Sequence, residues 1–316
     1  MIVLPGQEQE ITPKNSLHAN LLFRDRFIIV EIMKASILIF LSFLTLLLPG
    51  CTQIEINESD IFDIKRSISP DYFSSAPYDL EEVTFQTVDG LAIEGWYIRQ
   101  PDADGTILYC GGNGFVISAS HGIITSILEQ GVDLLVFNYR GYGTNSGSPS
   151  VDGVMADGSA AYDFLIQERG VDPAKLIIHG HSLGSVLASS LVNRTLPYVS
   201  GSVTAAGVVL ESPLTDAKDL TGQLLPWFLK PFVKLEIDSA LLEYSNLEEV
   251  KQYDLPLLII TGSEDIVTPQ GMAEKLYEHA RSTRKSLEII SGGGHNDLPQ
   301  RQEYRNALSE FYQCVF

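Results

Sequence analysis

Cysteine is scarce in this chain: its 316 residues include only three, Cys51, Cys110 and Cys314. So few thiols exclude a disulfide framework and a cysteine-based zinc site. Basic residues are also few, with 21 Lys and Arg against 40 Asp and Glu, and the formal net charge is −19. Because nucleic-acid backbones are polyanions, a chain this acidic is not expected to bind nucleic acid. The sequence also lacks internal repeats and low-complexity tracts.

Apolar residues, in contrast, make up 45% of the chain, and they occur in short runs that alternate with helical patterns. Runs such as LLII and VVL are typical of strands that helices cover on both faces. Segment 81–100 alternates around Asp89-Gly90 and predicts a β-hairpin. The sequence therefore predicts an α/β domain over 81–316, with a mostly parallel central sheet flanked by helices. Its expected strands are 106–110, 134–138, 176–179, 208–211, 257–261 and 287–290, and its expected helices are 116–130, 152–169, 183–195, 270–282 and 298–312.

The N-terminal part has the pattern of a targeting segment. Residues 33–51, MKASILIFLSFLTLLLPGC, place a lysine before a short apolar stretch that ends in Leu-Pro-Gly-Cys. A charged start and an apolar stretch of this length are typical of a signal peptide, and a membrane-spanning anchor over the same stretch is the alternative. We expect translation to begin at Met33, so that 1–50 comprises an over-read N-terminus and a signal peptide (33–50), followed by a tether over 51–80.

The Leu-Pro-Gly-Cys sequence resembles the lipobox of bacterial lipoproteins, in which the cysteine is lipidated and becomes the first residue. The resemblance implies lipidation of Cys51 and a protein attached to the bacterial cell envelope through a lipid anchor. Thr52, rather than an acidic residue, follows the cysteine. By the same resemblance, this favours the periplasmic face of the outer membrane if the host is Gram-negative.

A serine between two glycines, in Gly180-His181-Ser182-Leu183-Gly184, lies where an apolar strand passes into a helix of small residues. Glycines at these positions permit a tight turn in which the serine backbone is strained and its hydroxyl is exposed. An ordinary turn is the alternative, because Gly-x-Ser-x-Gly also occurs by chance.

Two further loops provide the partners that a reactive serine needs. Asp265 follows strand 257–261 in TGSEDIVTP, and His295 follows the last expected strand in IISGGGHND. Functional residues of such sheets gather at the carboxyl ends of the strands. A serine needs a base to become nucleophilic, and the imidazole needs an acid that fixes its tautomer. The order Ser182, Asp265, His295 therefore predicts a catalytic triad, with Glu211 as an alternative acid.

Segment 109–115, YCGGNGF, is a fourth loop at the same edge. Tetrahedral intermediates of acyl transfer need backbone N–H donors for their oxyanion. The amide of Leu183, just after the serine, is one expected donor, and the amide of Asn113 is the other. A dinucleotide-binding loop is not indicated, because the G-x-G-x-x-G spacing is absent.

On GGNG, NYRGYGTNSGSPS, GHSLGS, TGSEDIVTP and GGGHND, the chain is identified as a member of the α/β-hydrolase superfamily. Over roughly 80–316 it resembles the small-cap serine hydrolases, which include serine-aminopeptidase-like proteins, monoacylglycerol-lipase-like enzymes and protein depalmitoylases. The long interruption at 212–254 is expected to form the small cap. Related sequences often carry His-Gly-Asn where this one has Gly111-Gly112-Asn113, so the second oxyanion donor stays open.

These features predict a serine hydrolase that cleaves acyl ester or thioester bonds through an acyl-enzyme, with no metal or organic cofactor. An acyl-binding wall is expected from Trp227, Phe228 and Phe232 in LLPWFLKPFVKLEI, and simple packing of the insertion is the alternative. The expected partners are a small-molecule or lipid-like acyl substrate and, through the anchor, the membrane. Aminopeptidase or amidase activity, acyl transfer and a non-catalytic binding lipoprotein of the envelope are the alternative functions. The oligomeric state is not specified by the sequence.

Overall fold

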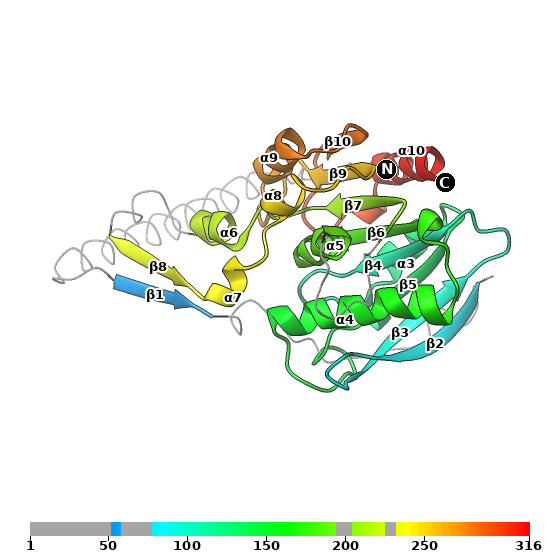
Figure 1. Ribbon diagram of the computed structural model, residues 1–316. Helices are drawn as coiled ribbons and strands as arrows, with labels where there is room; N and C mark the ends of the chain where they lie inside the picture. The colour runs from blue at the N-terminus through cyan, green and yellow to red at the C-terminus, as the bar shows by residue number, and fades with distance from the viewer. Residues whose placement is uncertain (1–51, 58–77, 194–203, 225–231) are drawn as a thin grey trace, which may run out of the picture. The chain divides into compact units, whose positions relative to one another are not determined.

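The computed structural model describes residues 52–57, 78–193, 204–224 and 232–316 (Figure 1). The main domain is built on an eight-stranded sheet in the order β10-β9-β7-β6-β4-β5-β3-β2. The strands are β2 (Asp79–Gln86), β3 (Ala92–Arg99), β4 (Thr106–Cys110), β5 (Asp133–Phe137), β6 (Leu176–His181), β7 (Gly207–Glu211), β9 (Leu257–Gly262) and β10 (Lys285–Ile290). β2 and β3 form the expected antiparallel hairpin, β3 also pairs antiparallel with β5, and the remaining pairs are parallel. The predicted fold class is confirmed.

Helices cover both faces of the sheet, which explains why its central strands are apolar throughout. One buried cluster contains Leu108 of β4 and residues of α4 (Val151–Asp163), α5 (Leu183–Asn193) and α9 (Gln270–His279). The other contains Ile107 of β4 and residues of α3 (His121–Leu128) and α10 (Gln302–Val315). Because successive strand residues point to opposite faces, each central strand contributes to both clusters.

Several segments expected to be single helices consist of an α-helix together with a 3-10 or π-helical segment at one end. The segment expected as 116–130 is a 3-10 helix, Ile117–Ala119, followed by α3, and the segment expected as 152–169 is α4 followed by a π-helix, Phe164–Glu168. The last one begins with a 3-10 turn, Leu298–Gln300, before α10. A proline lies in the first turn of this 3-10 segment, where its fixed φ is tolerated.

The chain between β7 and β9 forms the expected insertion. Its described parts are α6 (Ala217–Leu224), β8 (Val233–Ile237), α7 (Ser239–Leu242) and α8 (Asn246–Glu249). β8 pairs with β1 (Thr52–Ile56) in a separate two-stranded sheet. The segment predicted to be a tether therefore contains a strand. Cys51 and the predicted signal peptide lie outside the described residues, and within the described residues no helix is long and apolar enough to cross a membrane.

Candidate active site

Ser182 lies in the turn between β6 and α5, with a backbone φ of +52°. Such a positive φ strains a residue that has a Cβ atom. The glycines on either side are required by close backbone contacts. A Cβ atom on Gly180 would lie 2.2 Å from the carbonyl oxygen of Gly184, and one on Gly184 would lie 2.1 Å from the carbonyl oxygen of Cys110. The turn thus presents the serine hydroxyl at the carboxyl edge of the sheet.

A chain of hydrogen bonds joins Ser182, His295 and Asp265. His295 Nε2 lies 3.0 Å from Ser182 Oγ, and His295 Nδ1 lies 2.8 Å from Asp265 Oδ2. A carboxylate can only accept, so the ring proton is on Nδ1 and Nε2 is free to accept the hydroxyl proton. The structure therefore brings together the three residues that the sequence predicts to form a triad.

Asp265 is held by its own loop, which follows β9. Its Oδ1 accepts hydrogen bonds from the amides of Val267 and Thr268, each at 2.9 Å, and its Oδ2 accepts one from the Thr268 hydroxyl at 3.0 Å. Burial raises the pKa of Asp265, but the hydrogen bonds from His295 and Thr268 outweigh this and leave the pKa below its usual value. The carboxyl group is thus kept ionised beside the imidazole. Sequence reasoning missed Thr268, which lies three residues after the aspartate in the motif TGSEDIVTP.

Glu211, the alternative acid, is engaged elsewhere. Its Oε2 accepts hydrogen bonds from His179 Nε2 at 3.0 Å and from the Tyr304 hydroxyl at 2.9 Å. The carboxylate that contacts the His295 ring is that of Asp265. The hydrogen bonding thus favours Asp265 for the role of the acid.

The two expected oxyanion donors lie next to the serine. Leu183 is the first residue of α5, so its amide belongs to the helix N-terminus, where unpaired N–H groups and the helix dipole favour negative charge. Asn113 and Leu183 both line the cavity that contains Ser182. The Asn113 side chain accepts a hydrogen bond of 2.9 Å from the Tyr142 hydroxyl, which holds the loop in place.

The cavity beside Ser182 has a volume of about 270 Å³ and is mainly apolar. It lies between the insertion and the helices that follow β5 and β6. Its apolar lining consists of Val151, Val154, Met155, Leu183, Val186, Leu187, Leu214, Ala217, Leu220, Leu241, Tyr244 and Val267. Residues of the insertion thus line the same cavity as Ser182.

The residues predicted to form the acyl-binding wall are not among those lining residues. Trp227 and Phe228 lie outside the described residues, and Phe232 is 52% exposed. Sequence reasoning missed the lining from α4, including Val154 and Met155. The sequence could have indicated this lining, because α4 follows β5, and the carboxyl end of β5 lies at the same edge of the sheet as Ser182.

Comparisons with known proteins agree with this architecture. Residues 101–254 and 244–299 match the family model described as Serine aminopeptidase, S33. A Mycobacterium tuberculosis protein named only as uncharacterized is 32% identical over 218 residues, which are 68% of this chain and 72% of that protein. An Arabidopsis thaliana protein whose name states an alpha/beta hydrolase domain is 26% identical over 230 residues, 69% of this chain and 72% of its own. A solved esterase of Pyrococcus furiosus has the same fold, with a TM-score of 0.65 and 18% identity over 81% of this chain and 98% of the esterase.

Proposed function

The chain belongs to the serine aminopeptidase S33 family of α/β-hydrolases, and from this premise we propose that it is a serine hydrolase for carboxylic esters or thioesters with apolar acyl groups. The observation that carries the proposal is the hydrogen-bonded series Ser182, His295, Asp265, at 3.0 and 2.8 Å, beside an apolar cavity. Such a series activates a hydroxyl, and such a cavity suits a hydrocarbon chain.

The reaction proceeds in two halves. In the first, Ser182 Oγ attacks the acyl carbon while its proton passes to His295 Nε2, and the amides of Leu183 and Asn113 stabilise the oxyanion. The tetrahedral intermediate collapses, the bond to the leaving group breaks, and His295 returns the proton to the departing alcohol or thiol. In the second half, a water molecule gives a proton to His295 and attacks the acyl-enzyme, which releases the acid and regenerates the serine.

The apolar cavity supports esters over aminoacyl amides. Each methylene buried there contributes about 0.8 kcal/mol, or roughly a fourfold gain in kcat/KM. A free α-amino group would find little to bind among the aliphatic side chains of α4, α5 and the insertion. We therefore expect activity to rise with acyl chain length.

The proposal is tested with a fluorophosphonate probe and a panel of 4-nitrophenyl esters, acyl thioesters and aminoacyl amides. Ser182→Ala and His295→Ala should each lower kcat by several orders of magnitude, and the double variant should be little worse than either alone. Asp265→Asn should be milder. Ser309→Ala, on α10 and away from the cavity, is the matched control. Near-wild-type turnover in Ser182→Ala, or a strong preference for aminoacyl amides, would contradict the proposal.

For location, we propose a lipid anchor on Cys51, supported by the sequence of 33–51. Two or more acyl chains give stable membrane attachment, whereas a single chain binds weakly. Intact-mass spectrometry of the native protein should find a lipidated N-terminus at Cys51, and Cys51→Ser should leave the precursor uncleaved or the protein soluble. An unlipidated N-terminus upstream of Cys51 would overturn the anchor without bearing on the hydrolase.

A further inference from the structure

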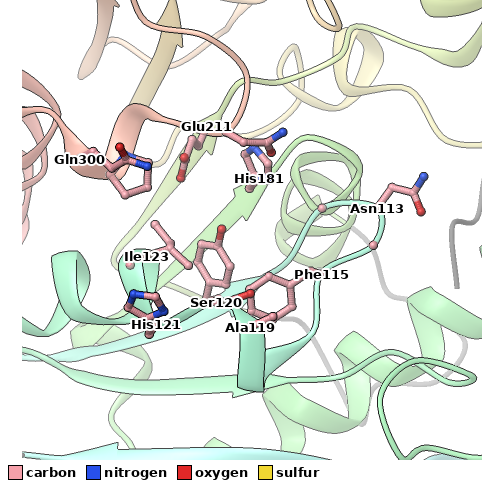
Figure 2. Close-up of a pocket in the computed structure, with 15 residues that line it drawn as sticks. Asn113, Phe115, Ala119, Ser120, His121, Ile123, His181, Glu211 and Gln300 are labelled. Atoms are coloured by element: carbon pink, nitrogen blue, oxygen red, sulfur yellow. The ribbon is translucent and has the colours of Figure 1, made fainter. Parts of the chain in front are cut away.

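A second cavity, of about 520 Å³, adjoins the oxyanion loop (Figure 2). Residues of α3 and of the 3-10 turn before α10 line it, whereas α4, α5 and the insertion line the apolar cavity. The two cavities therefore lie toward opposite faces of the sheet, and Asn113 lines both of them. Figure 2 shows Glu211, His181 and Gln300 on one side of the second cavity, with Ser120 and His121 across from them.

The carboxyl group of Glu211 is the charged group of this cavity. The residue is 2% exposed and lines the cavity. One of its oxygens, Oε2, accepts from His179 and Tyr304, whereas Oε1 has no hydrogen bond within the described part of the chain. Burial raises the pKa of Glu211, but the hydrogen bonds that it accepts from His179 and Tyr304 lower it, and the pKa lies below its usual value. The group is therefore ionised.

Glu211 has one ion-pair partner within the described chain. Within the described ranges, the partner of Glu211 in an ion pair is His179, and no lysine or arginine pairs with it. His179 Nδ1 is buried without a hydrogen-bond partner. Because a carboxylate can only accept, Nε2 is the ring atom of His179 that donates to Glu211. The Oε1 atom of Glu211, which has no hydrogen bond in the described part of the chain, can therefore pair with a cation that enters the cavity from outside.

Two further groups of the cavity can accept hydrogen bonds. His181 Nε2 donates to the carbonyl oxygen of His295 at 3.0 Å, so Nδ1 is left as an acceptor. Burial lowers the pKa of His181, which keeps the ring neutral. Tyr109 is 2% exposed, lines the cavity, and its hydroxyl has no hydrogen-bond partner among the described residues. The cavity thus offers an anion and two neutral acceptors to an entering donor.

The cavity is close enough to the reaction to hold part of the same substrate. Gly112 lines it, and a Cβ atom on Gly112 would lie 2.7 Å from His181 Nδ1 and 3.2 Å from Ser182 Cβ. The two groups attached to a scissile bond at Ser182 can therefore extend into different cavities. If the apolar cavity takes the acyl chain, the polar cavity takes the leaving group.

We propose that the second cavity is a subsite for a protonated amino group on the leaving part of the substrate, with the Glu211 carboxylate as its counter-ion. The inference rests on the proposed hydrolase function and narrows it to acyl esters or thioesters of amino alcohols or aminothiols. A protonated amine supplies both a positive charge and an N–H donor for the Glu211 carboxylate.

The test compares two butyrate esters of equal shape, the 2-(dimethylamino)ethyl ester, which is protonated at pH 7, and the neutral 3-methylbutyl ester. In the wild type, kcat/KM for the amine ester should exceed that for the neutral ester by about tenfold or more. Glu211→Gln keeps an acceptor for His179 and Tyr304 but removes the charge, and should bring the ratio to about one. Glu310→Gln makes the same change in net charge on the exposed part of α10 and should leave the ratio as in the wild type.

A second variant, Gln300→Lys, tests the subsite even if the Glu211→Gln protein does not fold. Gln300 lines the cavity and is exposed, so Gln300→Lys should fold and should lower the ratio at least several-fold by repulsion. A wild-type ratio near one, unchanged in both variants, would overturn the subsite and leave the hydrolase standing.

If neither ester is hydrolysed, the proposed function fails, and the subsite is judged by binding alone. Ligand-observed NMR with Ser182→Ala protein should then detect 2-(dimethylamino)ethanol but not 3-methylbutanol. The binding signal of 2-(dimethylamino)ethanol should be absent with the double variant, Ser182→Ala with Glu211→Gln. Equal binding of the two alcohols, or binding of neither, would refute the subsite.

Discussion

Filling the apolar cavity from the insertion should shorten the range of acyl chains that the enzyme accepts. Leu220, on α6, lines this cavity and is only partly buried. Leu220→Trp therefore directs a larger side chain into the cavity without disturbing the central sheet. Leu242→Trp is the matched control, because Leu242 belongs to the same insertion, is 51% exposed and does not line the cavity.

The size of the effect follows from the volume of the cavity. The substitution adds about six non-hydrogen atoms to a space of about 270 Å³, and we expect it to exclude about three methylene groups of a long acyl chain. At about 0.8 kcal/mol for each methylene, the loss is about 2.4 kcal/mol, or about sixtyfold in kcat/KM. A two-carbon acyl group does not reach the blocked region, so acetate should change by less than about threefold.

The assay is the dependence of kcat/KM on chain length with 4-nitrophenyl esters from acetate to octanoate. The wild type and Leu242→Trp should both rise along the series, and Leu220→Trp should level off after butyrate. A parallel loss for all esters would indicate damage to the triad rather than to the cavity. An unchanged octanoate rate in folded Leu220→Trp protein would refute the assignment of this cavity to the acyl chain.

Three further predictions concern stability. Asp157 is fully buried and accepts hydrogen bonds from the backbone and guanidinium groups of Arg140 at 2.7–2.9 Å. Asp157→Ala leaves Arg140 paired with Asp89 alone and its buried donors unsatisfied, which should cost about 2–3 kcal/mol in urea unfolding, and a loss below about 1 kcal/mol would contradict this. Hydrogen bonds from Arg140 and Thr87 lower the pKa of Asp89 from 3.8 to about 2, so its stabilising effect is present above pH 3.8 and is lost as the pH falls toward 2. Because Asp89 is half exposed, Asp89→Asn should remove only about 1 kcal/mol of that acid-dependent stability, measured by thermal unfolding across this range. Gly184→Ala places a Cβ atom 2.1 Å from a backbone oxygen and should abolish turnover or folding, whereas Gly222→Ala, with nothing within 4 Å, should fold and retain turnover.

The elements that the sequence predicts correctly are those with strong local signals. The apolar strands and the Asp89-Gly90 hairpin are encoded by nearby residues, and the structure has them within a few positions. The meeting of Ser182 with His295 is a longer-range expectation, yet it requires only that parallel strands end at one edge. Helix ends were less predictable, because the π-helix after α4 and the 3-10 turn before α10 depend on packing as well as on pattern.

The cavities could not be predicted from sequence, because each is assembled from side chains far apart in the chain. Val154 lies on α4, Leu220 on α6 and Val267 on the loop after β9, and no spacing connects them. The prediction instead favoured Trp227, Phe228 and Phe232, since aromatic residues form the most visible local cluster. Phe232 is half exposed and does not line the described cavity, so an aromatic cluster in an insertion is a weak guide to where substrate binds.

The different positions of Asp265 and Glu211 show why two acidic residues at one edge can have different roles. β6 and β7 are parallel and pair His181 with Glu211, so the side chains of these two residues extend to the same face. That face also carries Tyr109 and is covered by α3 and α10. Asp265, in contrast, lies in a loop beyond β9, where it can turn toward the His295 ring. The strand position thus keeps Glu211 away from the His295 ring and leaves its carboxyl group lining the second cavity, where we propose that it binds an amine.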